Sequence, residues 1–351
     1  MTRSARSWPL SRKAIVIRAV ALAVAGLAIY LLLPSLTRVL ASWPRLLTLD
    51  RVWLVVALVA EVASFTCAFA LQRLALQTRQ WFSVVTAGLT GNSVSGILPG
   101  GAAAGAGLQF EMLSHAGFDT DAAVGALTAF SLLEVGALLA MPVVVVPAVL
   151  AGTAISPGLE HTALLGLGMF CLLAVVGVVL LKTDRPLAAA GRAAQALRNR
   201  ITRSRRPPLT GLDARLLSER DTIRSVLGHN WWQALLLTVG RLGFDFGCLL
   251  AALRATGTHP QHALVLLAYA AANIIELVPI TPGGLGLVEA SLAGLLVLAG
   301  VHGGDALLAT LAYRLASYWL PLCAGPPAYL LYRHRYGRWH TSRGLDNAAQ
   351  R

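Results

Sequence analysis

The residues of this sequence whose types could do chemistry are acids and arginines placed inside apolar stretches. In the hydrocarbon core of a membrane an ionisable side chain costs about 2.5–3.5 kcal/mol to insert, so each one indicates a functional or a paired position. These residues are Glu61, Glu111, Glu134, Arg241, Asp245, Glu276, Glu289 and Arg314. Acids and arginines together can bind a charged or zwitterionic ligand, whereas an intramembrane enzyme would also need a nucleophile, and none accompanies them.

Two of these acids flank a break in an apolar segment. From Glu276 to Glu289 the sequence reads ELVPITPGGLGLVE, and the apolar composition around it extends over residues 263–298. No single helix is expected to run through this stretch, which contains Pro279, Pro282, Gly283, Gly284 and Gly286. In a bilayer, backbone groups freed by such a break find partners only when the break is buried in protein or lines a wet cavity. The break is therefore a candidate site.

A second break of the same kind lies far upstream in the chain. The sequence from Asn92 to Glu111 reads NSVSGILPGGAAAGAGLQFE, with Pro99 and Gly100 at the break and an acid on the helix that follows. Two interrupted apolar segments in corresponding halves of a chain indicate a transporter-type binding site near the midplane of the membrane. Asn92, Pro99, Gly100 and Glu111 are the candidate site residues of this half.

Arg314 lies in the apolar sequence LAYRLASYWLP and needs a counter-charge, for which a glutamate on the adjacent half-helix is the natural candidate. One hypothesis is a structural ion pair that locks the second break to the last span. The other is a headgroup or ion site, in which Arg314 and the helix N-terminus after Gly284 hold an anion such as a lipid phosphate. An ammonium would then lie against Glu289 or Glu276. Loss of transport in an Arg314→Gln variant that still expresses would favour the site, and loss of folded protein would favour the structural pair.

The other charges in apolar segments divide into two groups. Arg241 and Asp245 are four residues apart on one predicted helix, and we expect them to neutralise each other. Glu61 and Glu134 stand alone in their predicted helices, and the sequence leaves open whether they serve packing or a transport pathway.

These segments belong to an all-α, polytopic membrane protein. The chain has 351 residues, of which 56% are hydrophobic, and a mean hydropathy of +0.66, values that a soluble domain hardly reaches. A helix needs about 20 residues to cross the membrane. Six apolar windows of that kind are predicted as full spans: Ala14–Leu33, Val52–Leu74, Ala122–Leu150, Thr162–Leu181, Asn230–Leu253 and Ala306–Tyr332. With two broken hairpins at 82–113 and 263–298, they form one transmembrane domain over residues 1–351.

The net charge is +13, and the basic residues fall in the polar segments between the apolar runs. Basic residues collect in the segments near Arg73, from Lys182 to Arg224 and after Arg333, so these segments and both termini are predicted to be cytoplasmic. The two hairpins would then enter from opposite faces, as inverted repeats do. The basic loop at 182–224 is interpreted as a solvated loop, with an anionic-lipid patch or a docking site as alternatives. A sequence within it, LLSERDTIRSV, is expected to form an amphipathic helix.

Other function classes find no support in the sequence. The four cysteines lie singly in apolar runs without metal-ligand or disulfide spacing. The string GGAAAGAG lacks the Gly-Lys-Ser/Thr ending of a phosphate loop, and the basic residues do not gather as on a nucleic-acid-binding face. We therefore expect no cofactor, no metal, no nucleic-acid partner and no enzymatic activity.

The sequence PITPGGLGLVEASL, from Pro279 to Leu292, is followed by ATLAYRLASYWLPLCAG, from Ala309 to Gly325. Together they resemble the signature of the lysylphosphatidylglycerol synthase transmembrane region family, whose membrane part is associated with moving lipids between leaflets. The resemblance implies a protein of the bacterial cytoplasmic membrane and site roles for the matching residues, which are Asn92, Pro99, Gly100, Pro282, Gly283, Gly284, Gly286, Glu289 and Arg314. The soluble synthase domain of some members has no counterpart here, and Leu108 to Glu111 occupy positions where members often carry an arginine.

The function predicted is therefore that of a lipid flippase. Its cargo would be an anionic or aminoacylated phospholipid or a polyprenyl-phosphate-linked glycolipid, and protonation of Glu289 or Glu276 is a candidate coupling step. The alternative is a non-transporting membrane subunit that recruits or regulates a cytoplasmic glycosyltransferase or aminoacyl-transferase through the loop at 182–224.

Overall fold

A computed structural model describes residues 48–98, 101–150, 212–276 and 281–337, together with isolated positions between 37 and 46 and between 168 and 196. Within these ranges every regular element is a helix, which confirms the all-α prediction. The elements are α2 (Arg51–Ala75), α3 (Trp81–Ile97), α4 (Gly101–His115), α5 (Thr120–Leu150), α8 (Leu212–Ala255), α9 (His262–Glu276), the 3₁₀ turn η1 (Pro282–Gly284), α10 (Leu287–Leu298), α11 (Gly303–Arg314), the π-helical turn η2 (Leu315–Trp319) and α12 (Leu320–Tyr336).

Three stretches of these helices are long and apolar enough to span a membrane: Arg51–Ala75, Thr120–Leu138 and Asn230–Ala255. They coincide with three of the predicted windows. The windows at 14–33 and 162–181 lie almost wholly outside the described residues. The last window, 306–332, is divided among α11, η2 and α12, because the chain passes through a π-helical turn directly after Arg314.

The two predicted hairpins correspond to two pairs of shorter helices. The first pair, α3 and α4, has 17 and 15 residues, and the second pair, α9 and α10, has 15 and 12. At about 1.5 Å per residue none of them covers the roughly 30 Å of a hydrocarbon core.

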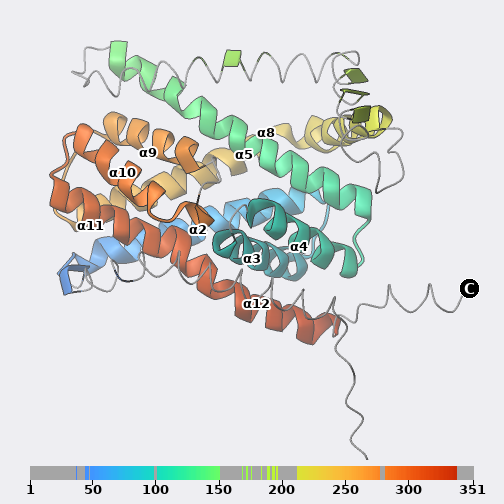
Figure 1. Ribbon diagram of the computed structural model, residues 1–351, viewed down its shortest axis with the longest axis horizontal. Helices are drawn as coiled ribbons and strands as arrows, with labels where there is room; N and C mark the ends of the chain where they lie inside the picture. Colours follow the sequence, from blue (N-terminus) through green and yellow to red (C-terminus); the bar gives the residue numbers. More distant parts are fainter. Residues whose placement is uncertain are drawn as a thin grey trace, which may run out of the picture.

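The two hairpins enter the bundle from opposite ends (Figure 1). The base of the first lies at the end where α12 finishes, since the Ser83 hydroxyl lies 2.9 Å from that of Tyr336 and the Tyr332 hydroxyl donates to the Met112 carbonyl. The base of the second lies at the other end, where α2 begins and the Asp50 N–H donates to the Ala255 carbonyl at 3.2 Å. The tips of the two hairpins therefore meet in the interior.

Small residues let the first hairpin and α12 pack closely. A Cβ atom on Gly91 would lie only 3.0 Å from the Gly105 carbonyl oxygen, and one on Gly325 would collide with the Ser93 side chain. Inside a membrane the hydrophobic effect does not drive helices together, so they associate largely through close backbone contacts of this kind. Gly105, in the glycine-rich string after the first break, thus serves helix packing.

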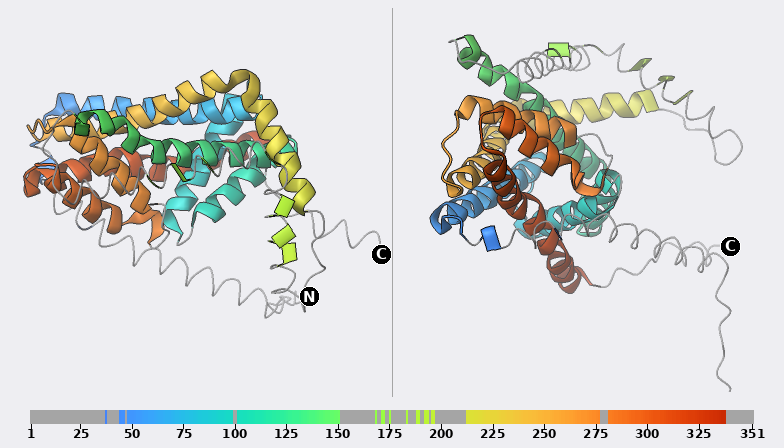
Figure 2. Two further views of the ribbon diagram at one scale, coloured as in Figure 1. Left: turned by 90° about the horizontal axis from the view of Figure 1, so that it is seen from above. Right: turned by 60° about the vertical axis from the view of Figure 1, so that its left-hand side comes forward.

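Of the basic loop, the structure describes only isolated positions before residue 212. From Leu212 the chain is helical, so the predicted helix LLSERDTIRSV is present as the first part of α8. Asn230 interrupts α8 with φ −110° and ψ 21°, and the preceding part turns away from the spanning part (Figure 2).

Candidate functional site

The second break begins where α9 ends at Glu276 and is closed by glycines in left-handed backbone conformations. Gly283, Gly284 and Gly286 have φ values of 55°, 70° and 80°, which residues with a Cβ adopt at a cost. A Cβ on Gly283 would also collide with the Tyr318 ring and lie 3.0 Å from the Gly96 carbonyl oxygen. The Pro-Gly-Gly sequence therefore folds as a compact turn directly against the first hairpin.

Glu289 caps the helix that follows this turn. Its carboxylate accepts the Gly286 N–H at the start of α10, so it satisfies one of the free donors of the helix N-terminus. Its other oxygen, Oε1, lies 3.4 Å from Arg314 Nε. Since Glu289 is only 4% exposed, this acid is held entirely by protein groups of the break.

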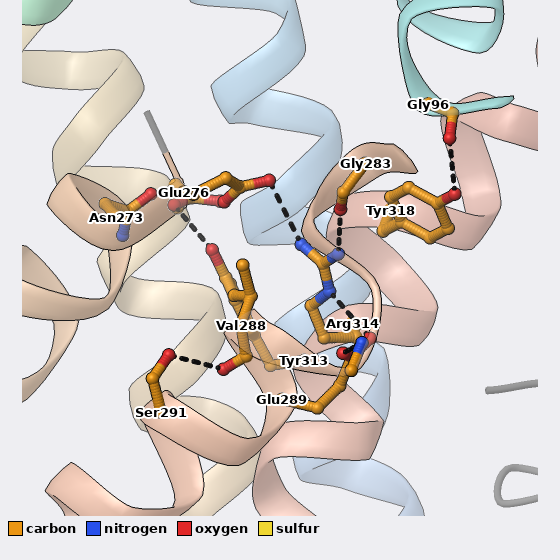
Figure 3. A network of polar contacts seen from close by, with 12 residues as sticks. Gly96, Asn273, Glu276, Gly283, Val288, Glu289, Ser291, Tyr313, Arg314 and Tyr318 are labelled. Carbon is orange, nitrogen blue, oxygen red and sulfur yellow. Dashed lines mark hydrogen bonds and ion pairs between the residues drawn. The ribbon is translucent and has the colours of Figure 1, made fainter. Parts of the chain in front are cut away.

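Arg314 ties the break to the last helices. Its Nη2 donates to the Gly283 carbonyl at 2.7 Å, its Nη1 lies 3.4 Å from Glu276 Oε1, and its guanidinium stands over the Tyr318 ring at 4.6 Å. Figure 3 shows these groups converging on the arginine from three sides. With 4% exposure and these contacts to two acids, a carbonyl group and a ring, Arg314 has the surroundings expected of a structural ion pair.

Tyr318 joins the two breaks. It lies in the π-helical turn η2, a distortion that is frequent at functional sites. Its hydroxyl donates to the Gly96 carbonyl of α3 at 3.0 Å, while its ring covers Arg314 of the other half. The side chain therefore holds the tips of the two hairpins at a fixed spacing.

Between the tips lies a cavity of about 320 Å³. Its walls come from both breaks, from α2 and α8, and from η2 and α12. The lining residues are Phe65, Asn92, Ser95, Gly96, Leu98, Gly101, Ala102, Arg241, Glu276, Thr281, Gly283, Gly284, Ser317, Tyr318, Pro321 and Leu322. The cavity thus combines an arginine, an acid, hydroxyls and apolar side chains at the point where the two interrupted segments meet.

Three polar atoms of this lining lack a hydrogen-bond partner among the described residues. They are Arg241 Nε, Thr281 Oγ1 and Ser317 Oγ, and each is buried. Buried polar groups in folded proteins are nearly always paired, so such orphans call for a ligand or water. A guanidinium N–H and two hydroxyls are donors, and an anion or a phosphate is the group that would satisfy all three.

The structure places the predicted site residues in three ways. Asn92, Glu276, Gly283 and Gly284 line the cavity. Gly286, Glu289 and Arg314 build the second break beside it without lining it, and Pro282 begins the 3₁₀ turn of that break. Glu111 is exposed on α4 and takes no part in the lining, while Pro99 and Gly100 lie outside the described residues.

Arg241 is the functional candidate that sequence reasoning missed, because it was expected to pair with Asp245 on its own helix, and its direct ion pair is with another helix instead. Arg241 Nη1 pairs with Glu134 of α5, and Asp245 accepts hydrogen bonds from the hydroxyls of Tyr269 and Tyr313. Packed neighbouring helices offer both groups better partners than an exposed helix surface would. In the sequence, Glu134 was the signal for this pairing, since it is an acid without a partner on its own predicted span.

Comparison with known proteins agrees with this architecture. A model of the family described as lysylphosphatidylglycerol synthase TM region matches residues 18–325. A UPF0104 membrane protein of Methanothermobacter thermautotrophicus is 32% identical over 96 residues, which is 27% of this chain and 27% of that protein, so the match spans about a quarter of that relative's length. No solved structure matches. Since the family model covers most of the sequence, the chain belongs to the lysylphosphatidylglycerol synthase TM region family.

Proposed function

We propose that the protein moves a lipid between the two leaflets of its membrane, with the lipid headgroup held in the cavity between the two helix breaks. The observation that carries this proposal is that both interrupted segments line one cavity, and that this cavity contains unpaired buried donors. Binding sites of transporters form in this way, at the meeting point of two broken helices.

The lining indicates the chemistry of the headgroup. Arg241, Thr281 and Ser317 offer their free donors to a phosphate, and Glu276 on the same lining offers its carboxylate to an ammonium. A volume of about 320 Å³ is at the small end of ligand pockets, which run from about 300 to 1,000 Å³. A phospholipid headgroup with both charges, such as that of an aminoacylated phosphatidylglycerol, fits this set better than a bare anion.

The path of the lipid follows from the placement of the hairpins. We propose that α3–α4 and α9–α10 are re-entrant in the membrane and enter from opposite faces, so that movement at either tip opens the cavity to one leaflet. The acyl chains stay in the surrounding lipid while the headgroup passes between the tips. In this proposal the membrane is the bacterial cytoplasmic membrane, both termini are cytoplasmic, and flipping requires no covalent step.

The experiment is a leaflet-exchange assay on the purified full chain in liposomes, comparing aminoacylated phosphatidylglycerol with a polyprenyl-phosphate glycolipid. Arg241→Lys keeps the positive charge opposite Glu134 but removes Nε, and we expect exchange to fall at least about tenfold, since a charge-assisted hydrogen bond contributes about 1.5–3 kcal/mol. Arg254→Lys is the matched control, because Arg254 is on the same helix and stacks on Trp53 outside the cavity.

Absence of exchange for both lipids, with folded protein, would contradict the proposal. It would favour the alternative function, a membrane subunit that recruits a cytoplasmic glycosyltransferase or aminoacyl-transferase. That alternative predicts that shortening the loop at 182–211 abolishes the phenotype, whereas lipid exchange should survive the same deletion.

A further inference from the structure

A second polar cluster lies in the bundle next to the cavity. Glu61 of α2 is 2% exposed, and its carboxyl group meets the carboxyl group of Asp245 and the thiol of Cys248, both on α8. Both acids lie within stretches that are apolar enough to span the membrane. Two carboxyl groups thus face each other in the interior of the protein.

The carboxyl groups of Glu61 and Asp245 have one hydrogen-bond donor too few. Asp245 Oδ2 already accepts the hydroxyls of Tyr269 and Tyr313, the latter at 2.9 Å. Glu61 Oε2 is buried and has no hydrogen-bond partner among the described residues. Ionised carboxylates only accept hydrogen bonds, so neither acid can satisfy the other. A proton on one of them would supply the missing donor.

The surrounding charges do not compensate two carboxylates. The charged and titratable groups that influence the pair from the packed helices are Arg241 and Cys248 on α8, Glu134 on α5, Tyr269 and Glu276 on α9, and Tyr313 on α11. Arg241 is the one cation in this set, and it is already paired with Glu134. Like charges at hydrogen-bond distance in a site of low polarity cannot both remain ionised.

We propose that Glu61 and Asp245 form a proton-binding site, in which the two carboxyl groups share one proton. A proton fits better than a metal ion, since no group of three His, Cys, Asp or Glu side chains that could hold a metal occurs in the described part of the chain. The site is distinct from Glu276 and Glu289, which belong to the break.

The proton site is connected to the cavity through Arg241. The Ser64 hydroxyl of α2 donates to the Arg241 carbonyl at 3.0 Å, which fixes this turn of α8 beside the helix that carries Glu61. Loss of the proton adds a negative charge near Arg241 and competes with a phosphate for its guanidinium. Protonation of the pair therefore favours headgroup binding, and by reciprocity headgroup binding favours proton uptake. This coupling rests on the proposed lipid transport, whereas the proton site itself does not.

The test of the site is infrared difference spectroscopy of the purified full chain in lipid nanodiscs, titrated through neutral pH in H₂O and in D₂O. We expect a carbonyl band of a protonated carboxyl group at neutral pH, with a deuterium shift, that disappears in Glu61→Gln. The glutamine amide replaces the protonated carboxyl group as the donor to Asp245, so this variant should fold. Asp245→Asn gives a second variant by the same reasoning, and Asp121→Asn, at an exposed position of α5, is the control that should keep the band.

Absence of the band in the wild type, or its persistence in both Glu61→Gln and Asp245→Asn, would overturn the proposal. A band that is absent while sodium ions, but not potassium ions, stabilise the wild type against unfolding would overturn it in favour of a sodium site. Lipid exchange is measured separately. Exchange that loses its pH dependence in Glu61→Gln supports the coupling, while a normal band without any exchange leaves the proton site intact and refutes the transport proposal.

Discussion

Replacement of Arg314 by glutamine should destabilise the fold. The substitution removes the donor to the Gly283 carbonyl and leaves two acids without their cation. Breaking a buried ion pair from one side costs about 3–5 kcal/mol. Glu289, at 4% exposure, is subject to this cost in full, whereas the Glu276 side chain is 37% exposed and water compensates most of its share. We therefore expect a loss of about 3–5 kcal/mol, a large part of a typical stability of about 5–15 kcal/mol.

The assay is thermal unfolding of the purified protein in nanodiscs, combined with the yield of monodisperse protein. Arg314→Lys keeps the charge but lacks the planar guanidinium that reaches two partners at once. Its loss of stability should therefore be smaller than that of Arg314→Gln. The double variant Arg314→Gln, Glu289→Gln lacks the uncompensated acid. Its loss of stability should therefore be less than the sum of the stability losses of the two single variants.

A specific outcome would refute this reasoning. If Arg314→Gln unfolds at the temperature of the wild type and lacks only lipid exchange, Arg314 is a ligand of the headgroup and the structural ion pair is the wrong interpretation. Additivity of the two single losses would show that Arg314 and Glu289 do not act on each other.

Three further predictions concern the two breaks and the cavity between them. Gly283→Ala should lower the stability of the fold by at least about 2 kcal/mol, because the backbone is left-handed there and the new Cβ collides with Tyr318. Gly257→Ala, at φ 81° with open space around it, should lower the stability by only about 1 kcal/mol in the same unfolding assay. Tyr318→Phe removes the bond to Gly96 and should increase hydrogen exchange at both hairpin tips, while unchanged exchange would contradict the bridging role. Arg241→Lys should lower lipid exchange at least about tenfold without lowering the unfolding temperature by more than a few degrees, and a large loss of stability would assign Arg241 to the fold instead.

The sequence predicted the features that depend on local chemistry. Two prolines and three glycines lie within residues 279–286, and this density makes a continuous helix unfavourable, so the position of the second break could be read directly. An arginine in an apolar segment requires an acid, and the pair of Arg314 with Glu289 follows from that requirement. Both predictions need no knowledge of how helices are rotated against one another.

The cavity donors depend on that rotation and could not be predicted. Arg241 and Asp245 share a helical face by spacing, yet packing directs one toward Glu134 and the other toward two tyrosines. Thr281 and Ser317 are unremarkable in the sequence, and their importance comes from lacking a partner in the interior. Glu111 shows the opposite error, since an acid that follows a break is exposed on the far part of its helix.

The most direct test of the central claim is lipid exchange by the double variant Thr281→Val, Ser317→Ala. These hydroxyls have no hydrogen-bond partner among the described residues, so their removal should leave stability unchanged or slightly higher. Ser291→Ala is the control, because that hydroxyl donates to the Val288 carbonyl away from the cavity. We predict a loss of exchange of about tenfold or more in the double variant and none in the control. Full exchange by a folded double variant would contradict a headgroup site between the two breaks.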